Sequence, residues 1–344
     1  MGLSVVTGGA GFVGTALVGR LLADGDRVRA VVPPHDPFTP DLRAAHPSDA
    51  LEIVSADVTD WDTLAPAFAG ATRVFHTAAL VHAWAPWERF QAVNVGGARN
   101  VARAVLEHGV ARLVHVSTTD VFGFPEGARV LDEQSPFRRW REPYADTKIE
   151  AEELLWTWRR EHGLPLTVIY PGWVYGPGDR AFFPALAEAI AGGFMLFWAR
   201  GIRLAWAYVE NLVDACVLAS EAPGAVGEGY IVFDTLEGPP LEDVCGRIAA
   251  RIGAAPPAWH VPYALALTLA RAAERLWRAV GARSAPPLRS VDVKAFGDQW
   301  TFSNAKARRA LGWSPRVGID EGMERALDAL VERRRDDRRC SGAE

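Results

Sequence analysis

Tyr144 and Lys148 are the two residues of this chain whose types and spacing most directly suggest chemistry. They are four positions apart, so in a helix they lie on one face. There an ammonium favours the phenolate form of the tyrosine and lowers a phenol pKa that is ordinarily about 10. Such a tyrosine can exchange a proton with an alcohol or a carbonyl near neutral pH. The spacing is also typical of solvated helix faces, so its interpretation depends on a glycine-rich N-terminus and on Ser117-Thr118-Thr119 upstream.

The size and composition of the chain indicate a globular protein of one large or two closely joined domains. Its 344 residues are 49% hydrophobic, and a formal charge of −5 lacks the basic footprint of a nucleic-acid-binding protein. The cysteines, Cys216, Cys245 and Cys340, match no metal-ligand spacing and are expected as thiols in a reducing compartment. The N-terminus has no signal-peptide pattern. We therefore expect a cytoplasmic protein with no metal, no nucleic-acid partner and no transmembrane segment.

Short apolar runs alternate with helical patterns through the first half of the chain. The expected strands cover residues 3–7, 27–32, 51–55, 73–77, 112–117 and 166–170. The expected helices between them cover residues 15–23, 61–68, 90–107 and 144–161. This alternation predicts an α/β fold with a doubly wound parallel sheet, in which ligands bind beyond the C-terminal ends of the strands.

A glycine-rich turn follows the first expected strand and opens a helix. Gly8 permits a tight turn, Gly11 lets the backbone approach a pyrophosphate, and Gly14 allows close packing of helix on strand. The helix N-terminus adds hydrogen-bond donors and positive partial charge. Together with Phe12 and Val13, these glycines are the candidate residues for binding NAD or NADP.

The residue that selects between NAD and NADP is expected near the end of the second strand. An acid there binds the ribose 2′-hydroxyl, whereas an arginine accommodates a 2′-phosphate. The nearby cations are Arg29 and His35, and the nearest acid, Asp36, follows two prolines. The sequence therefore leaves the choice of cofactor undecided.

The second half of the chain loses the regular alternation and predicts a smaller lobe. Residues 204–209 and 230–233 are expected as strands that return to the sheet. Further helices are expected over 184–191, 211–219, 241–252, 262–280 and 320–335. We assign 1–171 and 204–236 to a dinucleotide-binding domain, 172–203 and 237–332 to a substrate-binding lobe, and 333–344 to a charged tail.

The apolar pattern of residues 263–280 is cut by Arg271, Glu274 and Arg275. The uninterrupted run is far short of the ~20 residues that span a bilayer. A helix packed within the smaller lobe is the favoured interpretation, and a helix lying on a membrane surface is the alternative.

Segments spread over nearly the whole chain resemble the extended short-chain dehydrogenases/reductases. They are residues 7–14, 57–58, 76–79, 94–97, 116–123, 144–148 and 171–177. The resemblance implies a Rossmann fold and additional cofactor contacts. It assigns Asp57 and Val58 to the adenine, Ala78 and Ala79 to the ribose and pyrophosphate, and Pro171 and Val174 to the nicotinamide. Asn94 is either a cofactor contact or a backbone brace.

The resemblance also implies a catalytic set of Thr118, Tyr144 and Lys148. In this family the Thr118 position orients the substrate oxygen and the tyrosine exchanges a proton with it. Lys148 binds the ribose and lowers the pKa of Tyr144. The cofactor carries the hydride chemistry, and the protein positions and polarises the substrate.

Departures from the family pattern narrow the reaction. Dehydratases place Asp-Glu after the threonine, whereas this chain has Thr119-Asp120 and lacks the first acid, which argues against dehydration. Epimerases usually place an asparagine that grips the nucleotide where this chain has Trp173. The usual arginine before the Pro-Gly pair is replaced by Tyr170.

Residues 207–215, 260–263 and 302–313 resemble the 3β-hydroxysteroid dehydrogenase and sterol-4-carboxylate 3-dehydrogenase branch. We therefore expect an NAD(P)-dependent oxidoreductase that interconverts a secondary alcohol and a ketone on a bulky apolar substrate. A 3β-hydroxysteroid, a sterol-like molecule or a long-chain 3-hydroxy or 3-oxo compound is the expected class. The alternatives are a nucleotide-sugar epimerase or reductase and a non-catalytic dinucleotide sensor.

Thirteen tryptophans are many for this length and favour an aromatic substrate pocket. The main candidates for that pocket are Trp84, Trp173, Phe182 and Trp206, with Trp87, Phe183 and Trp198 as further candidates. The expected partner is a small apolar molecule, and the chain is a possible homodimer.

Overall fold

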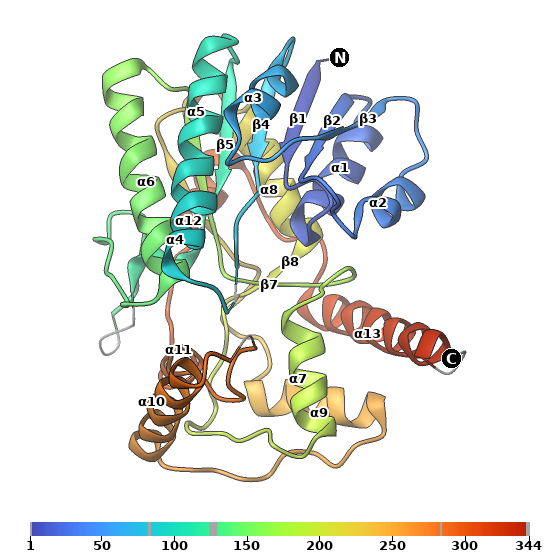
Figure 1. Ribbon diagram of the computed structural model, residues 1–344, viewed down its shortest axis with the longest axis vertical. Coiled ribbons are helices and arrows are strands. Elements are labelled where there is room, and N and C mark those ends of the chain that lie inside the picture. The colour runs from blue at the N-terminus through green and yellow to red at the C-terminus, as the bar shows by residue number, and fades with distance from the viewer. Residues whose placement is uncertain (1, 82–83, 124–128, 283, 342–344) are drawn as a thin grey trace.

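The computed structural model describes residues 2–81, 84–123, 129–282 and 284–341. Within this part of the chain, seven parallel strands form one sheet in the order β3-β2-β1-β4-β5-β6-β9 (Figure 1). Their bounds are β1 Leu3–Thr7, β2 Arg27–Val32, β3 Leu51–Ser55, β4 Arg73–His76, β5 Arg112–Val116, β6 Leu166–Pro171 and β9 Gly229–Val232. The predicted doubly wound parallel sheet is confirmed. Its strand order reverses between β1 and β4, which is where such sheets bind ligands.

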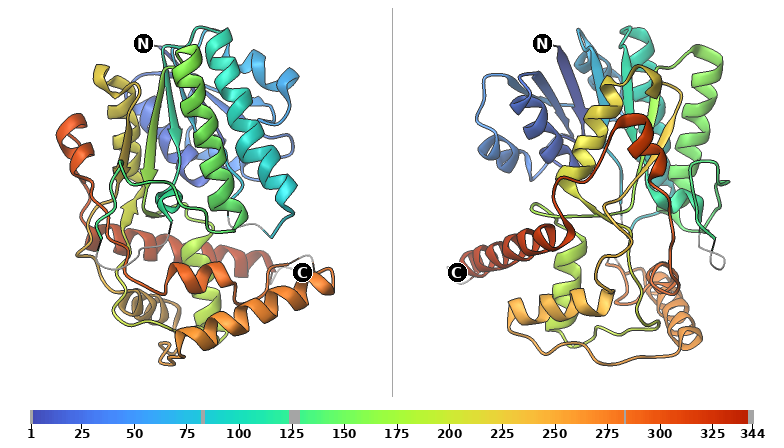
Figure 2. Two further views of the ribbon diagram at one scale, coloured as in Figure 1. Left: turned by 90° about the vertical axis from the view of Figure 1, so that its left-hand side faces the viewer. Right: turned by 180° about the vertical axis from the view of Figure 1, so that it is seen from behind.

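Helices cover both faces of the sheet (Figure 2). One face carries α1 Phe12–Ala23, α2 Thr39–Ala45, α8 Val209–Glu221 and α12 Ala305–Leu311. The other face carries α3 Trp61–Leu64, α5 Gly97–Glu107 and α6 Pro143–His162. Because both faces are buried, the strands read as nearly continuous apolar runs rather than as alternating patterns.

The helix expected over residues 90–107 is interrupted by a π-helical turn at Gln91–Gly96. The helix α4 (Trp87–Phe90) precedes this turn and α5 follows it. Asn94 lies in the turn and binds the backbone of Leu80 twice. The Leu80 N–H donates to Asn94 Oδ1 at 2.8 Å, and Asn94 Nδ2 donates to the Leu80 carbonyl at 3.2 Å. Of the two roles open to Asn94, these contacts support the backbone brace.

A second set of elements lies beyond the C-terminal edge of the sheet and has its own apolar clusters (Figure 1). They are β7 Trp173–Tyr175, α7 Phe182–Ala191, β8 Trp206–Tyr208, α9 Leu241–Ile252, α10 Tyr263–Ala279, α11 Ser290–Ala295 and α13 Ile319–Ser341. The predicted domain boundaries stay a prediction.

The expectation that residues 204–209 return to the main sheet is wrong. β8 instead pairs in parallel with β7 in a separate two-stranded sheet. The free edge of β6 is taken by β9. The chain leaves β6 at Gly172, and the Trp173 N–H then donates to the Ala205 carbonyl at 2.8 Å, which starts the β7–β8 pairing.

Gly14 generates a prediction about the glycine-rich turn. A Cβ added there would lie 2.1 Å from the Gly8 carbonyl oxygen, which is backbone and cannot rotate away. In a Gly14→Ala variant we expect the turn to be displaced, with a loss of about 1–3 kcal/mol in the free energy of unfolding. We also expect cofactor affinity to fall on the order of tenfold or more, because the turn no longer fits a pyrophosphate.

Urea unfolding and titration with NADH and NADPH check this expectation. The matched control is Gly246→Ala, a glycine inside α9 with no atom within 4 Å of its would-be Cβ. That variant gains about 0.5–1 kcal/mol because alanine is the better helix former. Equal stability and equal cofactor affinity of the two variants would show that the close approach of Gly14 to the Gly8 carbonyl is unimportant.

Candidate active site

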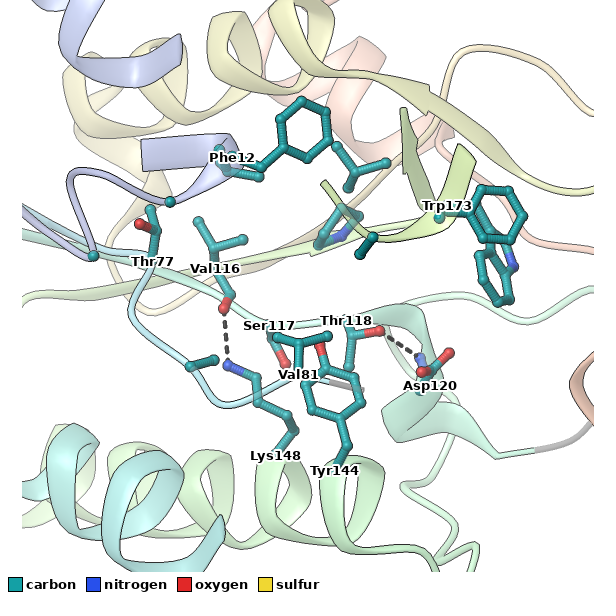
Figure 3. Close-up of a pocket in the computed structure, with 18 of the residues that line it drawn as sticks. Phe12, Thr77, Val81, Val116, Ser117, Thr118, Asp120, Tyr144, Lys148 and Trp173 are labelled. Carbon is teal, nitrogen blue, oxygen red and sulfur yellow. Dashed lines mark hydrogen bonds between the residues drawn. The ribbon is translucent and has the colours of Figure 1, made fainter. Parts of the chain in front are cut away.

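The C-terminal edge of the sheet opens onto a cavity of about 310 Å³. Thr118, Tyr144 and Lys148 all line it, and Phe12 lines the opposite side (Figure 3). Thr118 follows β5, whereas Tyr144 and Lys148 come from the first turns of α6. The three side chains predicted to be catalytic therefore meet in one place.

The start of α6 fixes the position of Tyr144. Pro143 occupies the first turn, and the Glu142 carboxylate caps the helix by accepting the Ala145 N–H at 3.0 Å. The Tyr144 side chain is hydrogen-bonded to Thr118. The two hydroxyl groups expected to hold a substrate oxygen are thus already side by side.

Tyr144 does not have the lowered pKa expected from its spacing to Lys148. Burial raises the pKa of Tyr144 well above its ordinary value, and the nearby Asp120 raises it further, with partial opposition from the Thr118 hydrogen bond. The expectation is wrong because the Lys148 ammonium points elsewhere: its Nζ donates to the Val116 carbonyl at 2.9 Å (Figure 3). Tyr144 is therefore a protonated phenol at neutral pH.

Lys148 is itself almost completely buried. Burial lowers the pKa of its ammonium, and the only opposing influence of note is the charge of Glu152. The Nζ atom also lies 3.2 Å from Nε2 of His115, whose ring packs on that of His76 with centroids 5.1 Å apart. Burial, followed by the charge of Lys148, lowers the pKa of both imidazoles, that of His76 to about 3. The two histidines are thus neutral neighbours of the ammonium.

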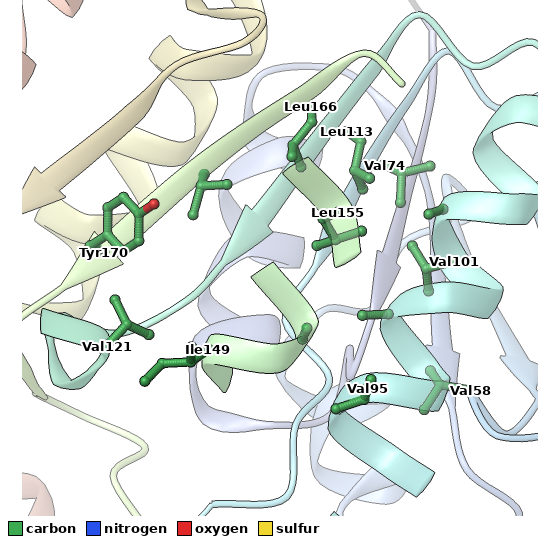
Figure 4. Packing of buried hydrophobic residues seen from close by; sticks show 14 of the residues in the cluster. Val58, Val74, Val95, Val101, Leu113, Val121, Ile149, Leu155, Leu166 and Tyr170 are labelled. Carbon is green, nitrogen blue, oxygen red and sulfur yellow. The ribbon is translucent and has the colours of Figure 1, made fainter. Parts of the chain in front are cut away.

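Glu152 is a buried acid one helical turn beyond Lys148, and the sequence analysis did not identify it. Its carboxylate accepts hydrogen bonds from Ser117 Oγ and from the Tyr170 hydroxyl, the latter at 2.7 Å. Burial raises the pKa of this carboxyl, and these hydrogen bonds and Lys148 lower it. Tyr170 stands where the family has arginine, and Figure 4 shows it on the same side of the sheet as Leu155 of α6. Two features of the sequence could have pointed to Glu152. It lies four residues after Lys148, and its partner Tyr170 stands where the family has an arginine.

Asp120 is a second acid that sequence reasoning considered only as a departure from the dehydratase pattern. It is half-buried and lines the cavity beside Thr118. Burial raises the pKa of Asp120 to about 7, with a further contribution from Glu142. Its carboxyl therefore titrates close to neutral pH beside Tyr144.

The cofactor candidates fall into two groups. Those that line the cavity are Gly8, Gly11, Phe12, Val13, Gly14, Ala79, Tyr144, Lys148, Pro171 and Val174. The turn fits a dinucleotide, since the backbone of its glycines faces the cavity without side chains and helix α1 begins there.

The remaining cofactor candidates lie outside the lining of this cavity. The Asp57 carboxylate accepts hydrogen bonds from the Thr59 N–H and hydroxyl, each at 2.8 Å. The Val58 side chain packs closely on the backbone of Gly97. The backbone of Ala78 lies against Gly8. Their predicted contacts with the cofactor stay predictions.

The side chains near the end of β2 are occupied by structural contacts. Arg29 donates to Glu52 at 2.8 Å and to the carbonyls of Ala67 and Ala69. Asp36 accepts the Phe38 N–H at 3.0 Å at the start of α2. Arg29 is thus occupied within the fold, whereas the hydrogen bonds of Asp36 with Phe38 and Thr39 both use its Oδ2 atom.

The aromatic candidates separate in the same way. Trp173 and Phe182 line the cavity, with ring centroids 5.0 Å apart. Phe296, which the sequence analysis missed, packs against Trp173 with ring centroids 5.0 Å apart. Trp206 was expected in the pocket but is completely buried, because β8 turns it into the aromatic cluster around Tyr175.

The other tryptophans and Phe183 are also outside this cavity. Trp84 and Trp87 line a second cavity of about 820 Å³, which Glu142 and Pro143 at the start of α6 also line. Phe183 is core. The Trp198 indole donates to the Val293 carbonyl at 2.8 Å, which fixes it against α11.

Known proteins with this sequence pattern identify the family. Residues 4–232 match the model of the NAD dependent epimerase/dehydratase family. A 2-alkyl-3-oxoalkanoate reductase of Stenotrophomonas maltophilia is 30% identical over 328 residues, covering 93% of this chain and 97% of that protein. A 3 beta-hydroxysteroid dehydrogenase/Delta 5→4-isomerase of Mycobacterium tuberculosis is 30% identical over 354 residues, covering 96% and 91%.

The fold also matches a solved structure over almost its full length. The crystal structure of gox2253 aligns with a TM-score of 0.78 at 28% identity, covering 97% of this chain and 99% of that one. The predicted resemblance and the predicted class, an oxidoreductase that uses a nicotinamide dinucleotide, are confirmed. The chain belongs to the NAD-dependent epimerase/dehydratase family.

Proposed function

We propose that this protein interconverts a ketone and a secondary alcohol on a bulky apolar substrate, with Thr118, Tyr144 and Lys148 as its catalytic residues. The observation that carries the proposal is the single cavity that joins the glycine-rich turn to these three side chains and to an aromatic wall. One end of the cavity fits a dinucleotide and the other fits an apolar molecule.

The substrate oxygen binds between the hydroxyl groups of Thr118 and Tyr144. Thr118 donates a hydrogen bond to the ketone oxygen, and Tyr144 transfers its phenolic proton to that oxygen as negative charge develops there. A bound nicotinamide supplies the hydride in reduction and accepts it in oxidation. The Lys148 ammonium, which the Val116 carbonyl holds in the same cavity, binds the ribose of the cofactor and so positions the cofactor beside Tyr144.

The raised pKa of Tyr144 keeps its phenol in the proton-donating form near neutral pH. A phenol that stays protonated is ready to donate, whereas oxidation of an alcohol requires the phenolate as a base. We therefore infer that alcohol oxidation becomes efficient only at higher pH than ketone reduction.

The aromatic wall supports an apolar substrate over a nucleotide sugar. Trp173 and Phe182 present ring carbons where a sugar nucleotide needs hydrogen-bonding groups. Relatives named for 2-alkyl-3-oxoalkanoates and for 3β-hydroxysteroids favour the same class. We propose a long-chain 3-oxo or 3-hydroxy compound or a steroid-like molecule, in a cytoplasmic protein. A homodimer stays a prediction.

Tyr144→Phe tests the proton transfer. In this variant we expect turnover of the active ketone to fall by about 10²–10⁴-fold, while NAD(P)H still binds, because only the transferable proton is removed. Wild type and variant are compared by NAD(P)H absorbance against steroids, 3-oxoacyl compounds and sugar nucleotides, with both cofactors.

Tyr230→Phe, a change on β9 away from the cavity, is the control and keeps full activity. Full activity of Tyr144→Phe would refute the proton-transfer role. Turnover restricted to sugar nucleotides would favour the epimerase alternative, and cofactor binding without any turnover would favour the sensor.

Glu152→Gln tests the charge next to Lys148. Burial lowers the pKa of Lys148 and Glu152 raises it, so removing the carboxylate lowers that pKa further. In the variant, the Lys148 ammonium therefore loses its proton at a lower pH than in the wild type. We expect the alkaline limit of kcat/KM to move down by on the order of one pH unit.

The control for this pH profile is Glu153→Gln, the next residue, whose exposed carboxylate pairs with Arg139 at 3.2 Å. Its profile should match that of the wild type. Superimposable profiles for Glu152→Gln and the wild type would mean that the buried acid has no influence on Lys148.

A further inference from the structure

A row of polar side chains crosses the sheet beside the glycine-rich turn. The strand register places Thr7 of β1 next to His76 of β4, and His76 next to His115 of β5. All three residues are almost completely buried. Leu113, two positions before His115 and therefore on the same face of β5, belongs to the apolar cluster that packs under α6. A histidine at position 115 is thus an exception to the packing around it.

This row of Thr7, His76 and His115 ends at the Lys148 ammonium. The Thr7 hydroxyl lies 2.7 Å from Nδ1 of His76. The rings of His76 and His115 pack with their centroids 5.1 Å apart. At the end of the row, Nε2 of His115 lies 3.2 Å from Nζ of Lys148. The row therefore connects the residue that precedes the glycine-rich turn with the lysine that lines the active-site cavity.

The contact with Lys148 fixes the tautomer of His115. An ammonium has only N–H donors, so Nε2 accepts the hydrogen bond and the ring proton lies on Nδ1. Burial, followed by the charge of Lys148, lowers the pKa of His115 and keeps the ring neutral. Among the described residues, Nδ1 of His115 has no hydrogen-bond partner, and neither has Nε2 of His76.

The unpartnered Nδ1 makes His115 a poor choice for packing alone. A buried donor without a hydrogen bond destabilises a fold, and nearly all buried polar groups in proteins avoid this situation. An apolar side chain, such as that of Leu113 on the same face, would fill the space without this cost. The presence of His115 therefore calls for a role other than packing, and the contact of its Nε2 with Lys148 supplies one.

Two acceptors on β5 hold the Lys148 ammonium. The Val116 carbonyl accepts at 2.9 Å and Nε2 of His115 at 3.2 Å (Figure 3 shows the first). An ammonium has three donors, so one remains for a group in the cavity. Two fixed acceptors determine the position of Nζ and the direction of the third N–H. With one acceptor alone, the ammonium could turn about a single hydrogen bond.

Glu152, the charged neighbour of Lys148, does not fix this direction. Its charge favours the ammonium form of Lys148. Its carboxylate, however, accepts hydrogen bonds from Ser117, Tyr170 and Trp156, and within the described ranges it forms none with Lys148. Glu152 therefore stabilises the charge, whereas His115 constrains the orientation.

We propose that His115 is a positioning residue that directs the Lys148 ammonium toward the ribose of a bound cofactor, and that His76 and Thr7 hold the His115 ring in place. The inference deepens the proposed function, on which it rests for the role of Lys148. Cofactor affinity and the pKa of Lys148 test it without any substrate. Its failure is therefore distinguishable from a failure to reduce ketones.

His115→Met tests the acceptor, because methionine fills a buried gap but is only a weak acceptor. We expect the affinity for NADH to fall about tenfold in a fluorescence titration, since the ammonium loses its fixed direction. The variant also loses a hydrogen bond to the charged form of Lys148. The pKa of Lys148, followed by NMR of the lysine side chains, should therefore fall by on the order of one pH unit.

His115→Gln is the conservative counterpart, because its amide oxygen can accept the same hydrogen bond. It should keep most of the NADH affinity and the Lys148 pKa of the wild type. The matched control is His108→Met, which changes an exposed histidine at the end of α5 and should behave as the wild type in both measurements. Circular dichroism should show all variants folded.

Thr7→Val provides a second test that does not alter His115. It keeps the shape of the side chain and removes the hydroxyl partner of His76. The pKa of Lys148 should fall in the same direction as in His115→Met, by a smaller amount. An unchanged pKa in Thr7→Val would overturn the part assigned to Thr7 and His76.

The role of His115 is overturned if His115→Met binds NADH as tightly as the wild type or if its Lys148 titrates as in the wild type. It is also overturned if His115→Gln loses as much affinity as His115→Met, because a disturbed fold would then explain the loss. A wild type that binds NADH but reduces no ketone would refute the proposed reaction and leave these comparisons intact.

Discussion

The burial of the Lys148 ammonium is the constraint on which the rest of the site depends. A buried charge is costly unless hydrogen bonds and an opposite charge compensate for it. Here the Val116 carbonyl accepts a hydrogen bond from the ammonium, and the buried Glu152 lies one turn along the same helix. Neighbouring histidines that stay neutral add no repulsion.

This constraint explains why α6 is fastened to the sheet by polar as well as apolar contacts. Glu152 accepts hydrogen bonds from Ser117 at the end of β5 and from Tyr170 on β6, so it ties the helix to two adjacent strands. At the start of the helix, Asp146 accepts the backbone N–H groups of Trp140 and Arg141 at 2.7 and 3.1 Å. Tyr144 is thereby held at the cavity by its surroundings rather than by Lys148.

The features that follow from local pattern could be predicted from the sequence. Alternating strands and helices predict the sheet, whereas Thr118 was assigned to the site through the family resemblance of the segment that contains it. Features that depend on three-dimensional burial could not. The spacing of Tyr144 and Lys148 does not determine the direction of the ammonium. The tryptophan content of the chain does not distinguish a tryptophan that lines a pocket from one in the core, such as Trp206. In the sequence, Glu152 resembles an acid on a helix surface. Only the structure shows that the Tyr170 hydroxyl donates a hydrogen bond to it.

The pKa of Lys148 tests this account most directly. The chain has only three lysines, Lys148, Lys294 and Lys306, so a protein labelled with 13C at lysine Cε gives three resolvable side-chain signals. Lys294→Arg and Lys306→Arg assign them, and an NMR titration then follows each ammonium. Lys148 is expected to lose its proton well below the ordinary lysine pKa of about 10.4, because burial destabilises its charge. A Lys148 that titrates at the ordinary value would contradict it.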